Sequence, residues 1–232
     1  MVKNVVELNI NKKVYDLICR RIKSKSHLIQ LLAEISSLII SNIPVKNNEY
    51  GKCIIRLENR RRIYFSINDA KSNVNKHFSF NFPFNISEEN GLLKLETMHR
   101  SIEIHSHHIA VIRALCSNDG FDEKLCRHGI LLDFTAFVAS VFEDLGLSFD
   151  FYEKDINQIL MELIMFEPGY IRFDNDEKNA NGRIHPLNHL DIFYSQSTTF
   201  KLGCSLLELD KFIDILEPAN ECEFIGEHHV HQ

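Results

Sequence analysis

The fold of this chain is decided by residues 170–203, "YIRFDNDEKNANGRIHPLNHLDIFYSQSTTFKLG", in which three short segments alternate apolar and polar residues. The segments are "YIRFDND" (170–176), "HLDIFYS" (189–195) and "TTFKLG" (198–203). A period of two is typical of a β-strand with one buried face and one wet face. We therefore expect the three segments to form a meander of strands whose apolar side lies on the core.

The alternation sorts the side chains of this meander into two faces. The apolar face holds Ile171, Phe173, Leu190, Ile192, Tyr194, Phe200 and Leu202. The polar face holds Arg172, Asp174, His189, Asp191 and Lys201. A final helix within "SLLELDKFIDILEP" (205–218), with Ser205 as its expected cap, should cover the apolar face. Its apolar residues are Leu206, Leu209, Phe212, Ile213 and Leu216.

The first part of the chain predicts helices followed by strands. Residues 11–43 repeat apolar side chains at three- and four-residue steps, with a break expected at 24–26, where Ser26 is a candidate cap. Residues 52–69 change to a period of two around "ENRR" and predict a hairpin. Residues 77–87 place Phe at alternate positions, and Pro83 indicates an edge strand or an irregular end.

The middle of the chain predicts further helices. Residues 90–115 are typical of a helix, or of a helix that follows a short strand. Residues 128–147 predict a buried helix that ends at Gly146. Residues 153–169 predict another, which Pro168 and Gly169 terminate.

These elements predict an α+β fold with N-terminal helices, a mainly antiparallel sheet, and a C-terminal three-stranded meander with a closing helix. We expect one domain over residues 1–232. Its sub-parts are a helix-plus-hairpin region (1–89) and a region of helices plus the C-terminal sheet (90–232). A length of 232 residues suffices for a core without disulfide or metal staples.

Composition and charge narrow the class of protein. The net charge of −6 provides no overall attraction to nucleic acid, although residues 3–62 carry an excess of Lys and Arg. None of the six cysteines has CxxC spacing, so a thiolate zinc site is not expected. The chain shows no secretory signal and no long apolar run, so we expect a cytoplasmic protein with reduced thiols and no membrane partner.

The polar face of the meander is the candidate catalytic site. Neighbouring carboxylates bind divalent cations, a histidine serves as a base, and Lys or Arg stabilises a developing anion. The predicted catalytic set is Arg172, Asp174, His189, Asp191 and Lys201, and the predicted metal set is Asp174, His185, His189 and Asp191. These residue types suit a metal-dependent nuclease-like hydrolase that uses Mg²⁺ or Mn²⁺. The alternative is a solvated sheet face that carries cross-strand charge pairs.

Three motif tests bear on this interpretation. "DNDEKNANG" (174–182) resembles a calcium loop, but Lys178 stands at its fifth position and glycine is missing at its sixth. "HPLNH" (185–189) has the histidine spacing of zinc peptidases but lacks the glutamate and contains a proline. Arg100 and His105 have the Arg-x4-His spacing of helical HEPN-type ribonucleases, an alternative that requires both on one helix. No Gly-rich phosphate loop appears, so no cofactor-binding residues are assigned.

The segments "RFDND", "GRIHPLNHLDIFYS", "TFKLG" and "LDKFIDIL" resemble the C-terminal signature of an uncharacterised bacterial family. The resemblance covers residues 172–216, and its matched residues are Arg172, Asp174, His185, Pro186 and His189. Where this chain has Asp191 the family often has histidine, which puts a fixed catalytic acid there in doubt.

Genes of this family resemble those found near restriction, toxin and antiphage-defence loci. The resemblance therefore implies a component of a bacterial antiphage-defence or toxin-like system that acts on nucleic acid, with protein partners encoded nearby. The alternative is a non-catalytic subunit or adaptor of a multi-protein defence complex. The charge asymmetry, the high phenylalanine content and the lack of any complete catalytic motif favour that alternative.

Overall fold

The computed structural model describes residues 4–20, 22–46, 48–58, 61–69, 74–118, 121, 131–182, 184–195, 198–217 and 220. The described residues have the expected α+β architecture, with N-terminal helices, an antiparallel sheet and a C-terminal meander followed by a helix. They divide into two compact units. One comprises residues 1–3, 16–44 and 83–167, and the other residues 4–15, 45–82 and 168–232. No helix in the described part is long and apolar enough to cross a membrane.

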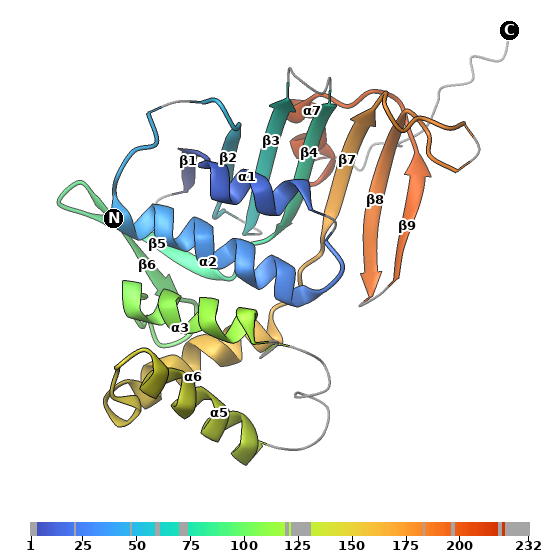
Figure 1. The fold of residues 1–232 in the computed structure, drawn as a ribbon. Coiled ribbons are helices and arrows are strands. Elements are labelled where there is room, and N and C mark those ends of the chain that lie inside the picture. Colours follow the sequence, from blue (N-terminus) through green and yellow to red (C-terminus); the bar gives the residue numbers. More distant parts are fainter. Residues whose placement is uncertain are drawn as a thin grey trace, which may run out of the picture. The chain divides into compact units, whose positions relative to one another are not determined.

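The second unit, which carries the candidate site, is built on a seven-stranded antiparallel sheet in the order β1-β2-β3-β4-β7-β8-β9 (Figure 1). The strands are β1 (Val5–Asn9), β2 (Lys52–Arg56), β3 (Arg62–Asp69), β4 (Val74–Asn81), β7 (Ile171–Asp176), β8 (Asn188–Ser195) and β9 (Thr198–Gly203). β2 and β3 form the expected hairpin, and β7, β8 and β9 form the expected meander. Strand β1 was not predicted, although "VVELN" alternates as an edge strand does.

One face of this sheet packs on helix α7 (Leu209–Ile215), which lies behind the strands in Figure 1. The buried core between them consists of Ile54, Tyr64, Phe173, Leu190, Leu207, Phe212 and Ile213. The expected closing helix is thus confirmed, and Leu209 and Leu216 pack at the border of this core. The cap is Glu208 instead of Ser205, and Leu206 is exposed, because the helix begins later than expected.

The first unit contains helices and a two-stranded antiparallel sheet. Its elements are α2 (Lys25–Ser41), β5 (Phe84–Glu89), β6 (Leu92–Thr97), α3 (Ser106–Ser117), α5 (Leu131–Asp144) and α6 (Phe149–Met165). Helix α1 (Lys12–Cys19) contributes residues to both units. The short strand β6 before α3 confirms the second of the two expectations for residues 90–115.

Several boundaries differ from the predicted ones for identifiable reasons. The phenylalanine-rich segment is two strands in different sheets, because Pro83 lacks the N–H that a continuing ladder needs. The N-cap of α2 is Ser24, two residues before the expected Ser26. Helix α6 starts at Phe149, after Ser148, which precedes the expected start at residue 153. The expected beginning of α5 at residues 128–130 and the tail after residue 220 lie outside the described residues.

Candidate functional site

The five residues of the predicted catalytic set come together on the face of the sheet opposite α7. Two rows across the strands place them there. Arg172 on β7 lies opposite Asp191 on β8, which lies opposite Lys201 on β9. In the next row, Asp174 on β7 lies opposite His189 on β8. We call these five residues the β7–β9 cluster, and the expected grouping on one face is confirmed (Figure 1 shows the three strands side by side).

Arg172 holds the two carboxylates of the cluster. Its Nε lies 2.9 Å and its Nη2 2.7 Å from Oδ2 of Asp174, and the same Nη2 lies 2.5 Å from Oδ2 of Asp191. The side chains of Arg172 and Asp174 are 13% and 5% exposed. Because a guanidinium presents fixed N–H donors, one arginine sets the spacing of both carboxylates.

His189 is buried and its tautomer follows from its two contacts. Nδ1 lies 2.9 Å from the carbonyl oxygen of Pro186, which can only accept, so Nδ1 carries the proton. Nε2 lies 2.8 Å from Nζ of Lys201, which can only donate, so Nε2 accepts. A histidine whose other ring nitrogen is anchored by a backbone carbonyl is the usual arrangement of a metal ligand or a base.

Lys201 joins the histidine to the second carboxylate. Its Nζ lies 2.7 Å from Oδ1 of Asp191 as well as 2.8 Å from His189. The lysine side chain is 32% exposed, which makes it the most accessible member of an otherwise buried cluster. The ammonium therefore lies between two groups that are themselves ligands of metal ions in proteins.

Asp174 is ionised, yet one of its oxygens is unused. Burial by itself would raise the pKa of Asp174, but the positive charges of Arg172 and Lys76 and the hydrogen bonds from Arg172 lower it below its usual value. Its Oδ2 faces Arg172 and lies 3.6 Å from Nε2 of His189. Its Oδ1 is buried and has no hydrogen-bond partner among the described residues. A buried carboxylate oxygen without a donor is costly, so this atom marks a place for a further positive or donating group.

Three of the four predicted metal ligands are close enough to share an ion. One ligand atom each from Asp174, His189 and Asp191 lies within 4.8 Å of the others. The fourth predicted ligand, His185, is not part of this group. Its ring packs edge-on against that of His189 with 4.4 Å between centroids, and its buried Nδ1 has no partner among the described residues. The described geometry therefore supports a three-residue ligand set with one imidazole and two carboxylates.

The cluster is balanced in charge as it stands. Two carboxylates face one guanidinium and one ammonium around the imidazole of His189. Such a network satisfies most of its own hydrogen bonds. It would therefore also suit a structural role, in which the cluster stabilises the fold or selects one register of the strands. Chemically, it can offer a nitrogen and two oxygen ligands to a cation, and Lys201 can meet an anion.

Two contributors had no role in the site assigned from the sequence. The carbonyl of Pro186 orients His189, whereas the sequence analysis named Pro186 only as a residue matched in the family resemblance. Lys76 on β4 lies opposite Asp174 and adds to the positive surroundings of its carboxylate. The pairing of β4 with β7 joins segments about a hundred residues apart, so no local pattern signals this neighbour.

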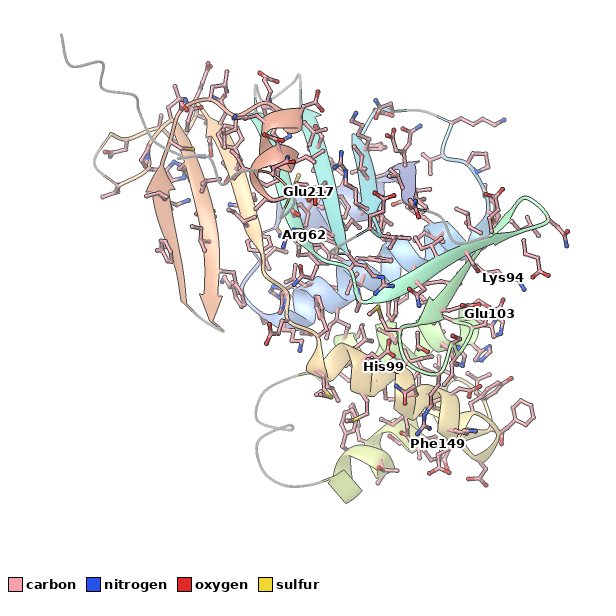
Figure 2. The ribbon with its side chains drawn as sticks, turned by 180° about the vertical axis from the view of Figure 1, so that it is seen from behind. Arg62, Lys94, His99, Glu103, Phe149 and Glu217 are labelled. Atoms are coloured by element: carbon pink, nitrogen blue, oxygen red, sulfur yellow. The ribbon has the colours of Figure 1, made fainter. Side chains whose placement is uncertain are left out.

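The ribonuclease alternative in the first unit is wrong. Arg100 lies in the turn after β6, and His105 is the N-cap of α3, so the two are not on one helix. The turn is held by Glu162, whose carboxylate accepts the backbone N–H groups of Met98 and His99 (Figure 2 labels His99). Glu162 therefore stabilises this turn through its hydrogen bonds.

Comparison with known proteins adds no relative from which a role can be transferred. No protein-family model matches this chain. Neither the curated proteins nor the solved structures contain a match. What the β7–β9 cluster does is therefore to be inferred from its own chemistry.

Proposed function

We propose that this protein is a component of a bacterial antiphage-defence or toxin-like system, and that it hydrolyses phosphodiester bonds of nucleic acid at the β7–β9 cluster with a divalent cation. The observation that carries the proposal is the convergence of Asp174, His189 and Asp191, with ligand atoms within 4.8 Å, beside the partly exposed Lys201. Carboxylates and an imidazole can hold the cation, and a lysine can stabilise a developing anion, so these groups suit such hydrolysis.

Each residue has a role that follows from its contacts. Asp174, His189 and Asp191 would hold the cation, which supplies a Lewis acid and an activated water when bound. Arg172 is a positioning residue, because its guanidinium bonds both carboxylates and its side chain is only 13% exposed. Lys201 is the member that can reach solvent and would contact a phosphate oxygen. A mixed nitrogen and oxygen ligand set favours Mn²⁺ over Mg²⁺, which prefers oxygen alone.

A second candidate is a non-catalytic subunit or adaptor whose partners are encoded nearby. The observation that favours it is the internal charge balance of the cluster, which needs no added ion to neutralise its carboxylates. In that case the cluster would stabilise the β7–β9 end of the sheet and help to shape a binding surface.

Cleavage assays on the purified protein separate the two candidates. Single- and double-stranded DNA and RNA are incubated with Mn²⁺, with Mg²⁺ or with a chelator. We expect cleavage with Mn²⁺, and a loss of at least about a hundredfold in Asp174→Asn and His189→Ala, as for removal of a group that acts in the transition state. The matched control is Asp176→Asn, because Asp176 lies on the same strand and bonds Asn179 instead of the cluster.

The outcomes assign the protein to one class. Cleavage that the chelator and both cluster variants abolish, but the control variant retains, supports the hydrolase. No cleavage of any substrate, together with growth arrest that appears only when neighbouring genes are co-expressed, supports the adaptor. Circular dichroism of every variant tests whether a loss of activity is caused by a loss of fold.

A further inference from the structure

We propose that the ammonium group of Lys201 occupies the place of the divalent cation, so that lysine and cation are alternative occupants of one site and phosphodiester binding favours the cation. This inference rests on the cation site of the proposed function. It adds to that site an internal cation that must leave before the metal enters.

The contacts of Lys201 are those expected of a bound cation. Its Nζ is 2.8 Å from Nε2 of His189 and 2.7 Å from Oδ1 of Asp191, and these are ligand-type atoms of two of the three residues in the candidate set. The lone pair of Nε2 points at the ammonium because Pro186 fixes the proton on the other nitrogen. The third residue, Asp174, has a buried Oδ1 with no partner in the described part of the chain.

Lys201 can leave while the rest of the site stays. It lies on β9, an edge strand of the sheet, and its side chain is 32% exposed. A lysine side chain is a flexible stem with a compact charge, so it can swing to solvent without moving the strand. Arg172 is 13% exposed and bonds both carboxylates, so it keeps the ligands in place when the lysine moves.

Charge explains why a phosphodiester would favour the exchange. With Lys201 inside, two carboxylates balance two cations. A divalent cation in place of the ammonium leaves one excess positive charge in a largely buried site, which is unfavourable alone. One phosphodiester group restores neutrality, and the displaced ammonium gains an anionic partner. Metal and nucleic acid should therefore bind with positive and reciprocal coupling.

The first test measures Mn²⁺ binding by electron paramagnetic resonance of free Mn²⁺ and by calorimetry, without nucleic acid. Lys201→Met removes the competing charge, and Lys201→Gln removes it while keeping a hydrogen-bond donor for His189 and Asp191. We expect both variants to bind Mn²⁺ at least about tenfold more tightly than the wild type, because the ion no longer breaks charge-assisted hydrogen bonds. Lys178→Met, at an exposed lysine outside the cluster, should leave the affinity unchanged.

The second test measures the same affinity in the presence of a phosphorothioate oligonucleotide that resists cleavage. Mn²⁺ affinity of the wild type should rise by about tenfold, whereas the affinity of Lys201→Met, which is already high, should change little. Folding of each variant is checked by its denaturant midpoint. Equal or weaker Mn²⁺ binding in folded Lys201→Met and Lys201→Gln would overturn the inference.

Failure of this inference is distinguishable from failure of the proposed function. Tighter Mn²⁺ binding in both Lys201 variants, with no cleavage by any form of the protein, sustains the exchange and overturns the hydrolase. Cleavage by the wild type, with no gain of Mn²⁺ affinity in the folded Lys201 variants, sustains the hydrolase and overturns the exchange. Loss of the gained affinity in Lys201→Met combined with Asp174→Asn would place the ion in this cluster.

Discussion

His77 makes the stability of the sheet unit depend on pH in a way that one substitution should remove. The side chain lies on β4, is 2% exposed, and stacks on Phe173 with 5.9 Å between ring centroids, while Phe212 of α7 lies 6.1 Å away. Neither ring nitrogen has a hydrogen-bond partner among the described residues. Burial lowers the pKa of His77 from 6.5 to about 4, because a charged imidazole is poorly solvated between these rings.

The sign follows from proton linkage. The unfolded chain takes up a proton at His77 near pH 6.5, whereas the folded unit stays neutral until about pH 4. Above pH 6.5, His77 therefore does not reduce the free energy of unfolding. As the pH falls from 6.5 towards 4, the free energy of unfolding decreases by about 1.4 kcal/mol per pH unit. Between pH 7 and pH 5, protonation linked to this single residue should lower the free energy of unfolding by about 2 kcal/mol.

The assay is urea unfolding followed by far-ultraviolet circular dichroism at pH 7, 6 and 5, for the wild type and for His77→Phe. Phenylalanine keeps the stack and does not titrate, so the variant should lose about 2 kcal/mol less than the wild type between pH 7 and pH 5. At pH 7 it should be more stable by about 1 kcal/mol, since no polar ring is buried unpaired. His77→Leu, with a smaller side chain, guards against overpacking by phenylalanine. Equal pH dependence in the wild type and both variants would refute the reasoning.

Three further substitutions should lower stability through separate physical effects. Glu34→Ala removes the buried acceptor of two guanidinium hydrogen bonds from Arg113, at 2.7 and 2.8 Å. It should lower the free energy of unfolding, measured by denaturant unfolding, by about 2 kcal/mol. Gly51→Ala should cost more than about 2 kcal/mol in the same assay, because its φ is +108° and the added Cβ would lie 2.3 Å from the carbonyl oxygen of Ser66. Glu162→Ala leaves two backbone N–H groups of the turn after β6 without their acceptor, and should cost about 1 kcal/mol and speed their hydrogen exchange.

Most of the element types follow from local patterns in the sequence. The period of two in residues 170–203 placed Arg172 and Asp174 on one face and Phe173 on the other, as the structure has them. The helical period also predicted the helices. The breaks at Pro83 and Pro168 were predictable too, because a proline interrupts the hydrogen bonding of a sheet or a helix. Helix starts were less predictable, since Ser24, Ser148 and Glu208 are not distinguished from neighbouring polar residues by propensity alone.

By itself, the sequence determined which side chains share a face of the meander, because alternation is a property of each strand alone. Only the tertiary structure decided which of them meet. A slip of two residues between β8 and β9 would keep both faces and still separate Lys201 from Asp191, so hydrogen-bond register and core packing had to select the observed pair. The tertiary structure likewise decided the pairing of β4 with β7, the burial of His77, and the position of the Lys201 ammonium between His189 and Asp191. These features depend on contacts between segments distant in the chain, and no local pattern records them.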